Sequence, residues 1–221
     1  SVAIGLGTLQ DQNFTTATDA LNTAVGHGAA SSVTTGIQNT FLGGLAGDAI
    51  TDADFNVAVG YAALGSDTLG SNSTAIGWSA LASQNFSTAT LSYNTAVGFK
   101  AGLDVTTGEQ NTFVGALAGE NVTTGTENVA LGYAALAFED AHGKNTALGW
   151  SALKNLNAGA DGLNTAVGNN AGRNMGLGRE NTLVGALSGD AITSGTQNVA
   201  IGVNALGQED TSSFNVAIGR E

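Results

Sequence analysis

Side chains able to carry out covalent or acid–base chemistry are few in this chain and far apart. It has no cysteine, and this absence excludes a thiolate nucleophile, a disulfide framework and a thiolate metal site. It has two histidines, His27 and His142. No serine-centred motif accompanies either histidine, and we interpret both as exposed loop residues. The sequence therefore predicts a protein that is not an enzyme, with no catalytic residue and no cofactor.

Carboxylates occur at predicted turns: Asp52, Asp54, Glu139, Asp140, Glu209 and Asp210. Asx-type hydrogen bonding within turns accounts for such positions. Asp52 and Asp54 are close enough in sequence to contact Ca²⁺, but the loop pattern of an EF-hand is absent. We interpret the carboxylates as an acidic, solvated edge and predict no metal site.

The composition excludes several classes of partner. The 221 residues include 33 Gly and no Pro, and 6 Lys and Arg stand against 18 Asp and Glu, for a net charge of -12. Nucleic-acid binding needs clustered cations and is not expected. No apolar stretch approaches the roughly 20 residues of a membrane-spanning helix, so we expect no membrane insertion of this segment. The 42% hydrophobic content exceeds that of a disordered chain.

An internal repeat organises the chain. The unit Asn-Thr/Val-Ala-aliphatic-Gly occurs thirteen times, with a basic period of 17 that is lengthened at every fourth repeat. We number positions from the Asn, so that the closing glycine is position five. The closing glycines are Gly5, Gly26, Gly43, Gly60, Gly77, Gly98, Gly115, Gly132, Gly149, Gly168, Gly185, Gly202 and Gly219.

A longer period groups the repeats in fours. The block that begins at Asn22 returns at Asn94 and again at Asn164. We therefore predict one repeat array over residues 1–221, with cassettes at 22–93, 94–163 and 164–221. Residues 1–21 are the end of a preceding cassette, and we expect the chain to be a fragment of a longer one.

One repeat is expected to form one coil of a parallel β-solenoid. Frequent glycine disfavours helix, whereas Thr-Ala-Val and Ala-Ala-Leu bounded by glycine and Thr-Thr-Gly turns predict two short strands per coil. Identical positions then stack from coil to coil. The Asn at position one is expected to form a ladder of side-chain amides, and the Gly at position five a corner with positive φ.

The two faces of the predicted strand are both apolar. Position four is always aliphatic, and we place it inside the coil together with position two. Position three, on the opposite face, is Ala except at Phe41, Phe113 and Leu183, where position nine is Gly. Because a strand that is apolar on both faces is usually covered on both, we predict a subunit interface along position three that includes these three residues. The pattern requires a second chain without fixing the number of chains.

The repeats resemble a known family. Asn-Thr-Ala-Val-Gly and Asn-Val-Ala-Ile-Gly resemble the YadA-like head repeats of trimeric autotransporter adhesins. The segment 111–119 followed by Thr123-Thr124-Gly125 also resembles repeats of bacteriophage-like tail fibres. The resemblance implies a left-handed parallel β-roll, a homotrimer and an extracellular location on a bacterial surface or virion. The period of 17 is longer than that of the adhesin heads, which favours the tail-fibre branch.

The lengthened repeats carry matched loops. Residues 13–18 match residues 85–90, and Tyr93 lies nearby. One interpretation is contact with a glycan or protein receptor on a host surface. The other is that Phe14 and Phe86 fill the interior where the loop leaves the coil, and their matched register favours it. The candidate receptor-contact residues are Asn13, Phe14, Thr16, Asn85, Phe86, Thr88 and Tyr93.

Three functions compete. The leading hypothesis is a structural or adhesive segment of a trimeric fibre that mediates or spaces attachment to a host cell or surface. The alternative is a monomeric ice-binding or other ligand-binding solenoid, because Thr recurs at position two. Val57, Val129, Val199 and Val216 interrupt that row, which we also expect to face inward. A polysaccharide-cleaving enzyme with a site between chains has no motif behind it.

Overall fold

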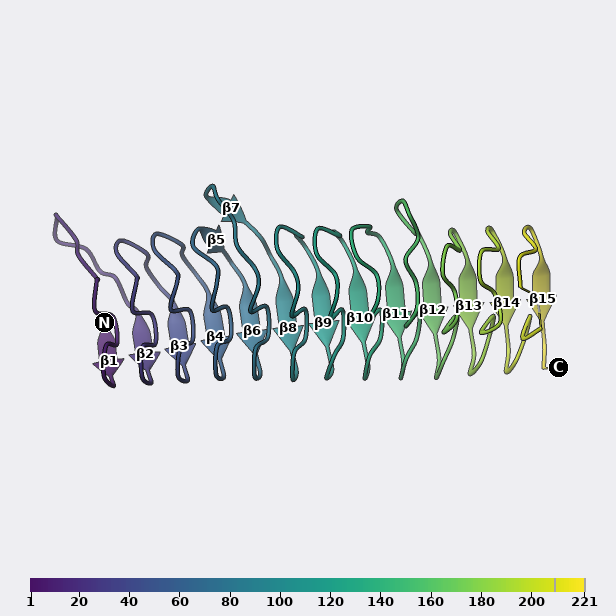
Figure 1. Ribbon diagram of the computed structural model, residues 1–221, viewed down its shortest axis with the longest axis horizontal. Helices are drawn as coiled ribbons and strands as arrows, with labels where there is room; N and C mark the ends of the chain where they lie inside the picture. Colours follow the sequence, from purple (N-terminus) through teal and green to yellow (C-terminus); the bar gives the residue numbers. More distant parts are fainter. Residues whose placement is uncertain (209, 221) are drawn as a thin grey trace.

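The computed structural model describes residues 1–208 and 210–220, and within them one short strand from each repeat pairs into a single parallel sheet (Figure 1). The thirteen strands of this sheet are β1 (Val2–Ile4), β2 (Thr23–Val25), β3 (Thr40–Leu42), β4 (Val57–Val59), β6 (Thr74–Ile76), β8 (Thr95–Val97), β9 (Thr112–Val114), β10 (Val129–Leu131), β11 (Thr146–Leu148), β12 (Thr165–Val167), β13 (Thr182–Val184), β14 (Val199–Ile201) and β15 (Val216–Ile218). Two further strands, β5 (Gly70–Ser71) and β7 (Thr90–Leu91), form a separate parallel pair.

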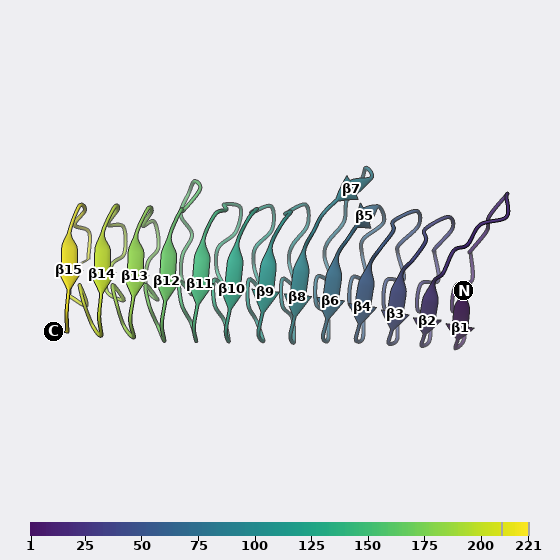
Figure 2. The ribbon, with the colours of Figure 1, turned by 180° about the vertical axis from the view of Figure 1, so that it is seen from behind.

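The sheet order follows the sequence order, so each coil lies against the next. Equivalent positions pair across every junction, as in Ala96 with Phe113 and Ala130 with Phe113. The chain ends consequently lie at opposite ends of the stack, which is equally clear from behind (Figure 2). The predicted all-β parallel β-solenoid of thirteen coils, with a basic period of 17, is confirmed.

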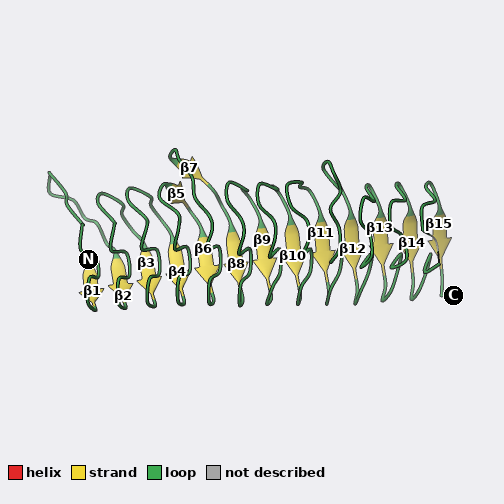
Figure 3. Ribbon diagram, in the orientation of Figure 1, coloured by secondary structure: helices red, strands yellow, loops and turns green. Residues whose placement is uncertain are grey.

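The prediction of a second strand in each coil is wrong. After the closing glycine of each of the first twelve coils the chain forms turns, and Figure 3 shows one strand of the long sheet per coil, with β5 and β7 as the other strands. In these turns every second residue has a left-handed backbone conformation, as at Leu117 and Gly119, each with φ 60°. This alternation bends the backbone. The N–H of Leu117 donates to Phe99 O of the preceding coil at 2.9 Å, and that of Gly119 to Ala135 O of the following coil at 3.0 Å.

The closing glycines form the predicted corner with positive φ, between 129° and 145°. A Cβ on Gly115 would lie 2.6 Å from Gly132 O in the next coil. Backbone therefore stacks on backbone at this corner, and only glycine leaves room for it.

The predicted asparagine ladder is confirmed. The side chain of Asn111 donates from Nδ2 to Gly125 O at 2.8 Å, and its Oδ1 accepts the backbone N–H of Asn128 at 3.0 Å. The amide thus ties its own coil to the next at a buried position. The ladder is interrupted at Ser73, where Gln84 donates to Ser73 Oγ at 2.9 Å and accepts from Asn94 Nδ2 at 2.9 Å.

The predicted assignment of the two strand faces is reversed. Position three is buried in all eleven internal coils, and Phe41, Phe113 and Leu183 are 0% exposed. These three side chains fill the interior of their own chain, so they are not the subunit interface. Positions two and four point outward instead. Because both faces are apolar, side-chain polarity carried no information about which one turns inward.

The volume compensation between positions three and nine acts within a coil. A Cβ on Gly119 would lie 2.4 Å from Phe113 Cε1, and one on Gly47 would lie 2.2 Å from Phe41 Cε1. In the third coil of each cassette, and in the fourth coil of the first two, position three is Ala and position nine is Leu, as at Leu136, which is fully buried. Large and small residues thus alternate across the interior rather than across a contact between chains.

Asn111→Ala is expected to lower the free energy of unfolding by about 2–4 kcal/mol, because Gly125 O and Asn128 N–H would remain buried without their side-chain partner. Urea denaturation at fixed protein concentration measures the change. Asn155→Ala removes an exposed amide whose one side-chain contact, to Asn174, is long at 3.4 Å, and should change stability by less than about 0.5 kcal/mol. Equal effects of the two substitutions would show that the ladder does not stabilise the stack.

Candidate interaction surfaces

The outer side of the long sheet is an apolar surface, which we call the sheet face. It consists of positions two and four of all thirteen coils, and none of these side chains is buried. Position four holds Ile4, Val25, Leu42, Val59, Ile76, Val97, Val114, Leu131, Leu148, Val167, Val184, Ile201 and Ile218. Position two holds eight Thr and five Val: Val2, Thr23, Thr40, Val57, Thr74, Thr95, Thr112, Val129, Thr146, Thr165, Thr182, Val199 and Val216.

The sheet face carries no charged side chain, although the chain as a whole has a net charge of -12. Leu42 is 48% exposed and Leu131 is 44% exposed. Within the described residues, the hydroxyls of the eight position-two threonines make no hydrogen bond to protein. A continuous apolar surface of this length on a parallel sheet is typical of an interaction site.

The long loops project from the edge of the stack opposite to the ends of the strand arrows (Figure 1). In the loop at 85–93, Phe86 is 4% exposed and packs beside Gly70, where an added Cβ would lie 2.7 Å from its Cδ2. This position agrees with the anchor interpretation of Phe86. Asn85, Thr88 and Tyr93 are exposed on the same loop, and Tyr93 is 52% exposed.

The first loop differs from its counterpart. Phe14 is half-buried and lies in an open pocket of about 400 Å³, while Asn13 and Thr16 are exposed. The pocket is lined by Phe14, Thr15, Thr16, Thr18, Thr35, Ile37, Asp52 and Asp54. The candidate loop residues therefore lie on two separate loops, at 13–16 and at 85–93.

The carboxylates of that pocket have protein partners. Asp52 accepts hydrogen bonds from Thr34 Oγ1 at 2.6 Å and Thr35 Oγ1 at 2.7 Å, which hold the pKa of its carboxyl below the ordinary value. Asp54 Oδ1 accepts the backbone N–H of Ile37 at 2.8 Å. In the part of the chain that the structure describes, no group of three or more His, Cys, Asp or Glu side chains is arranged to hold a metal ion.

Two buried carboxylates hold the long loops: Asp67, which the sequence analysis did not single out, and Glu139, which it placed on a solvated edge. Asp67 Oδ1 accepts from the backbone N–H groups of Gly70 at 3.1 Å and Phe86 at 3.3 Å. Glu139, at the equivalent position of the next cassette, accepts the N–H of Ala158 through Oε2 and that of His142 through Oε1, both at 3.2 Å. Each carboxylate lies in the coil that precedes a lengthened coil. Their shared position ahead of the two loops was the signal available in the sequence.

Glu139 therefore does not belong to a solvated acidic edge, because it is 0% exposed. Burial raises the pKa of its carboxyl above the ordinary value of 4.5. His142 is only partly exposed, and its Nδ1 lies 3.2 Å from Glu139 Oε1. His27 is exposed, as predicted.

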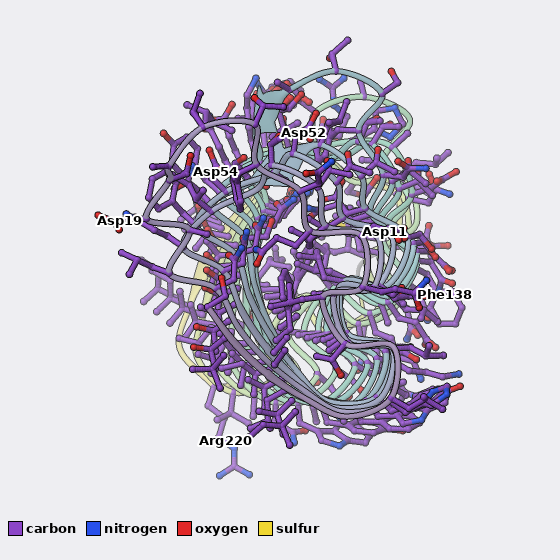
Figure 4. The ribbon with its side chains drawn as sticks, turned by 90° about the vertical axis from the view of Figure 1, so that its left-hand side faces the viewer. Asp11, Asp19, Asp52, Asp54, Phe138 and Arg220 are labelled. Atoms are coloured by element: carbon purple, nitrogen blue, oxygen red, sulfur yellow. The ribbon has the colours of Figure 1, made fainter. Side chains whose placement is uncertain are left out.

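A third surface follows each closing glycine. Position six holds stacked aromatic side chains in five coils, which we call the aromatic ridge: Tyr61, Trp78, Phe99, Tyr133 and Trp150. Ring centroids lie 6.3 Å apart for Tyr61 and Trp78, and 5.2 Å apart for Trp78 and Phe99, with interplanar angles of 16° and 14°. In the view along the stack, Arg220, at position six of the last coil, points away from the coil, far from Asp52 and Asp54 of the loop edge (Figure 4).

These features define the class of protein: the chain is a parallel β-solenoid repeat protein with an apolar sheet face, anchored loops and an aromatic ridge. No family model, curated protein or solved structure matches it. Over residues 1–208 and 210–220, no helix is long and apolar enough to cross a membrane.

Glu139→Gln is expected to change how stability depends on pH. A raised pKa means that the folded state binds the Glu139 proton more tightly than the unfolded state does. The free energy of unfolding of the native protein should therefore gain a falling component as pH rises from about 4.5 to above the folded pKa. The variant should lack that component.

Urea denaturation across this pH range measures the slope. Glu127→Gln removes an exposed carboxyl and should leave the pH dependence close to that of the native protein. Identical pH profiles for Glu139→Gln and the native protein would contradict the role of burial at Glu139.

Proposed function

We propose that this chain is a structural segment of an extracellular homotrimeric fibre on a bacterial surface or virion. Three left-handed β-rolls pack through their sheet faces, and the segment spaces or mediates attachment to a host cell or surface. No catalytic role is part of the proposal. The observation that carries it is the sheet face, which runs through thirteen coils without a charged residue.

The exposed apolar rows support association of like chains. An apolar side chain exposed at every coil gains from removal from water in proportion to the area covered. The rows are straight and regular because equivalent positions pair at every junction, so an identical face offers a matching repeat. The repeats' resemblance to trimeric adhesin heads and tail fibres supports three chains.

The absolute mass in solution tests the proposal. The native protein should have about three times the chain mass of 21.8 kDa by light scattering behind a sizing column. The double substitution Leu131→Glu and Leu148→Glu places two charges on adjacent coils of the sheet face and should yield monomers, because the charges would be buried unpaired.

Leu177→Glu is the matched control, because Leu177 is 60% exposed and lies outside the sheet face. It should leave the trimer intact. A native protein that remains at 21.8 kDa at high concentration would contradict the proposal.

A monomeric ice-binding solenoid is the second candidate. One observation favours it beyond the sequence: the position-two threonines point outward with hydroxyls free of protein hydrogen bonds in the described residues. This removes one objection, since the row had been expected to face inward. Ice-growth measurements should then show thermal hysteresis that Thr95→Tyr and Thr112→Tyr together abolish. Thermal hysteresis equal to that of buffer would eliminate this candidate.

A further inference from the structure

We infer that the aromatic ridge is a binding surface for a neutral, extended polysaccharide. The five side chains are between 45% and 51% exposed. Both tryptophans of the chain and two of its three tyrosines lie on this one line. Exposed aromatic residues gathered in this way are typical of recognition sites, because each offers a rigid apolar surface, to which Trp and Tyr add a polar atom.

The fold does not require aromatic residues at these positions. Position six is Gly44 and Ala116 in neighbouring coils and Asn169 in a later one, while the closing glycines keep the same range of φ. The corner therefore forms with small or polar side chains. Since stacking leaves about half of each ring exposed to water, stability alone does not explain the choice of five large aromatic residues.

The polar atoms of the ridge are available to a ligand. Among the described residues, Trp78 Nε1, Trp150 Nε1 and the hydroxyls of Tyr61 and Tyr133 make no hydrogen bond to protein. These groups lie beside apolar ring surface. A sugar presents the complementary combination, with C–H groups for the rings and hydroxyls for the indole N–H and phenol groups.

The layout of the ridge favours a polymer. The ridge consists of two aromatic segments, separated by the coil that has Ala116 at position six. The first segment contains Tyr61, Trp78 and Phe99, and the second contains Tyr133 and Trp150. A ligand that contacts both segments must lie along the stack across several coils. The ring spacing of 5.2–6.3 Å is comparable to the length of one pyranose unit in an extended glycan.

Charge favours a neutral ligand. The chain has a net charge of -12, which disfavours an anionic polymer. Among the described residues, the cation stacked on the ridge is Lys100, whose Nζ lies 5.7 Å from the ring centroids of both Trp78 and Phe99. Its charge is thus directed at the rings. Binding here does not depend on the proposed trimer.

Intrinsic fluorescence provides a direct test, because the only two tryptophans lie on the ridge. The native protein is titrated with cellohexaose, chitohexaose, mannohexaose and maltohexaose. At least one should cause a saturable change in emission. Trp78→Ala should weaken binding of that sugar by at least about tenfold, measured by calorimetry, and Trp78→Phe should restore part of the affinity.

Phe138→Ala is the matched control, because it removes an equally exposed aromatic residue from outside both the ridge and the candidate receptor loops and should leave affinity unchanged. Circular dichroism and light scattering on every variant check folding and mass. Failure of all four sugars to change the emission or to release heat would overturn the inference. Undiminished binding in the double variant Trp78→Ala, Trp150→Ala would also overturn it. A lower mass of that variant would overturn it as well, since the ridge would then be a contact between chains.

Discussion

The close approach of backbone between successive coils is the constraint on which the rest of the structure depends. At the closing glycines of the first twelve coils, an added Cβ would lie only 2.1–2.6 Å from the carbonyl oxygen of the next coil. The asparagine ladder fixes the same junction through buried amides. Together they hold each coil in register with its neighbours, so a residue type at one position of the repeat becomes a row along the molecule.

Every surface considered for function is such a row or an interruption of one. The sheet face repeats positions two and four, and the aromatic ridge repeats position six. The loops leave the stack where every fourth coil is lengthened, and Asp67 and Glu139 hold the starts of the two later loops through backbone N–H groups. The ridge lies near the ends of the strands and the loops lie at the opposite edge, so these two surfaces are separate from each other.

The elements that depend on the close approach of backbone between coils were predictable from the sequence. The direction in which the apolar strand side chains point was not. Gly115 and Asn111 were predictable because few other residues fit a stacked corner or a buried amide ladder. The direction of Phe113 was not, because Thr-Phe-Val is apolar on both sides and position nine compensates equally well inside a coil. The prediction consequently placed position three on the outside and positions two and four on the inside, which is the reverse of the structure. The expectation that one apolar face of the strand is exposed in the single chain was correct.

The central claim is that the sheet face is covered by other copies of the chain. The absence of native cysteine permits a direct measurement with single cysteines at Leu131 and Leu177, which are 44% and 60% exposed in the single chain. The account predicts that a thiol reagent labels Leu131→Cys much more slowly than Leu177→Cys in the native protein, and that the difference disappears when the assembly is dissociated. Equally fast labelling of both cysteines in the native protein would show that the sheet face is open to solvent and would contradict the account.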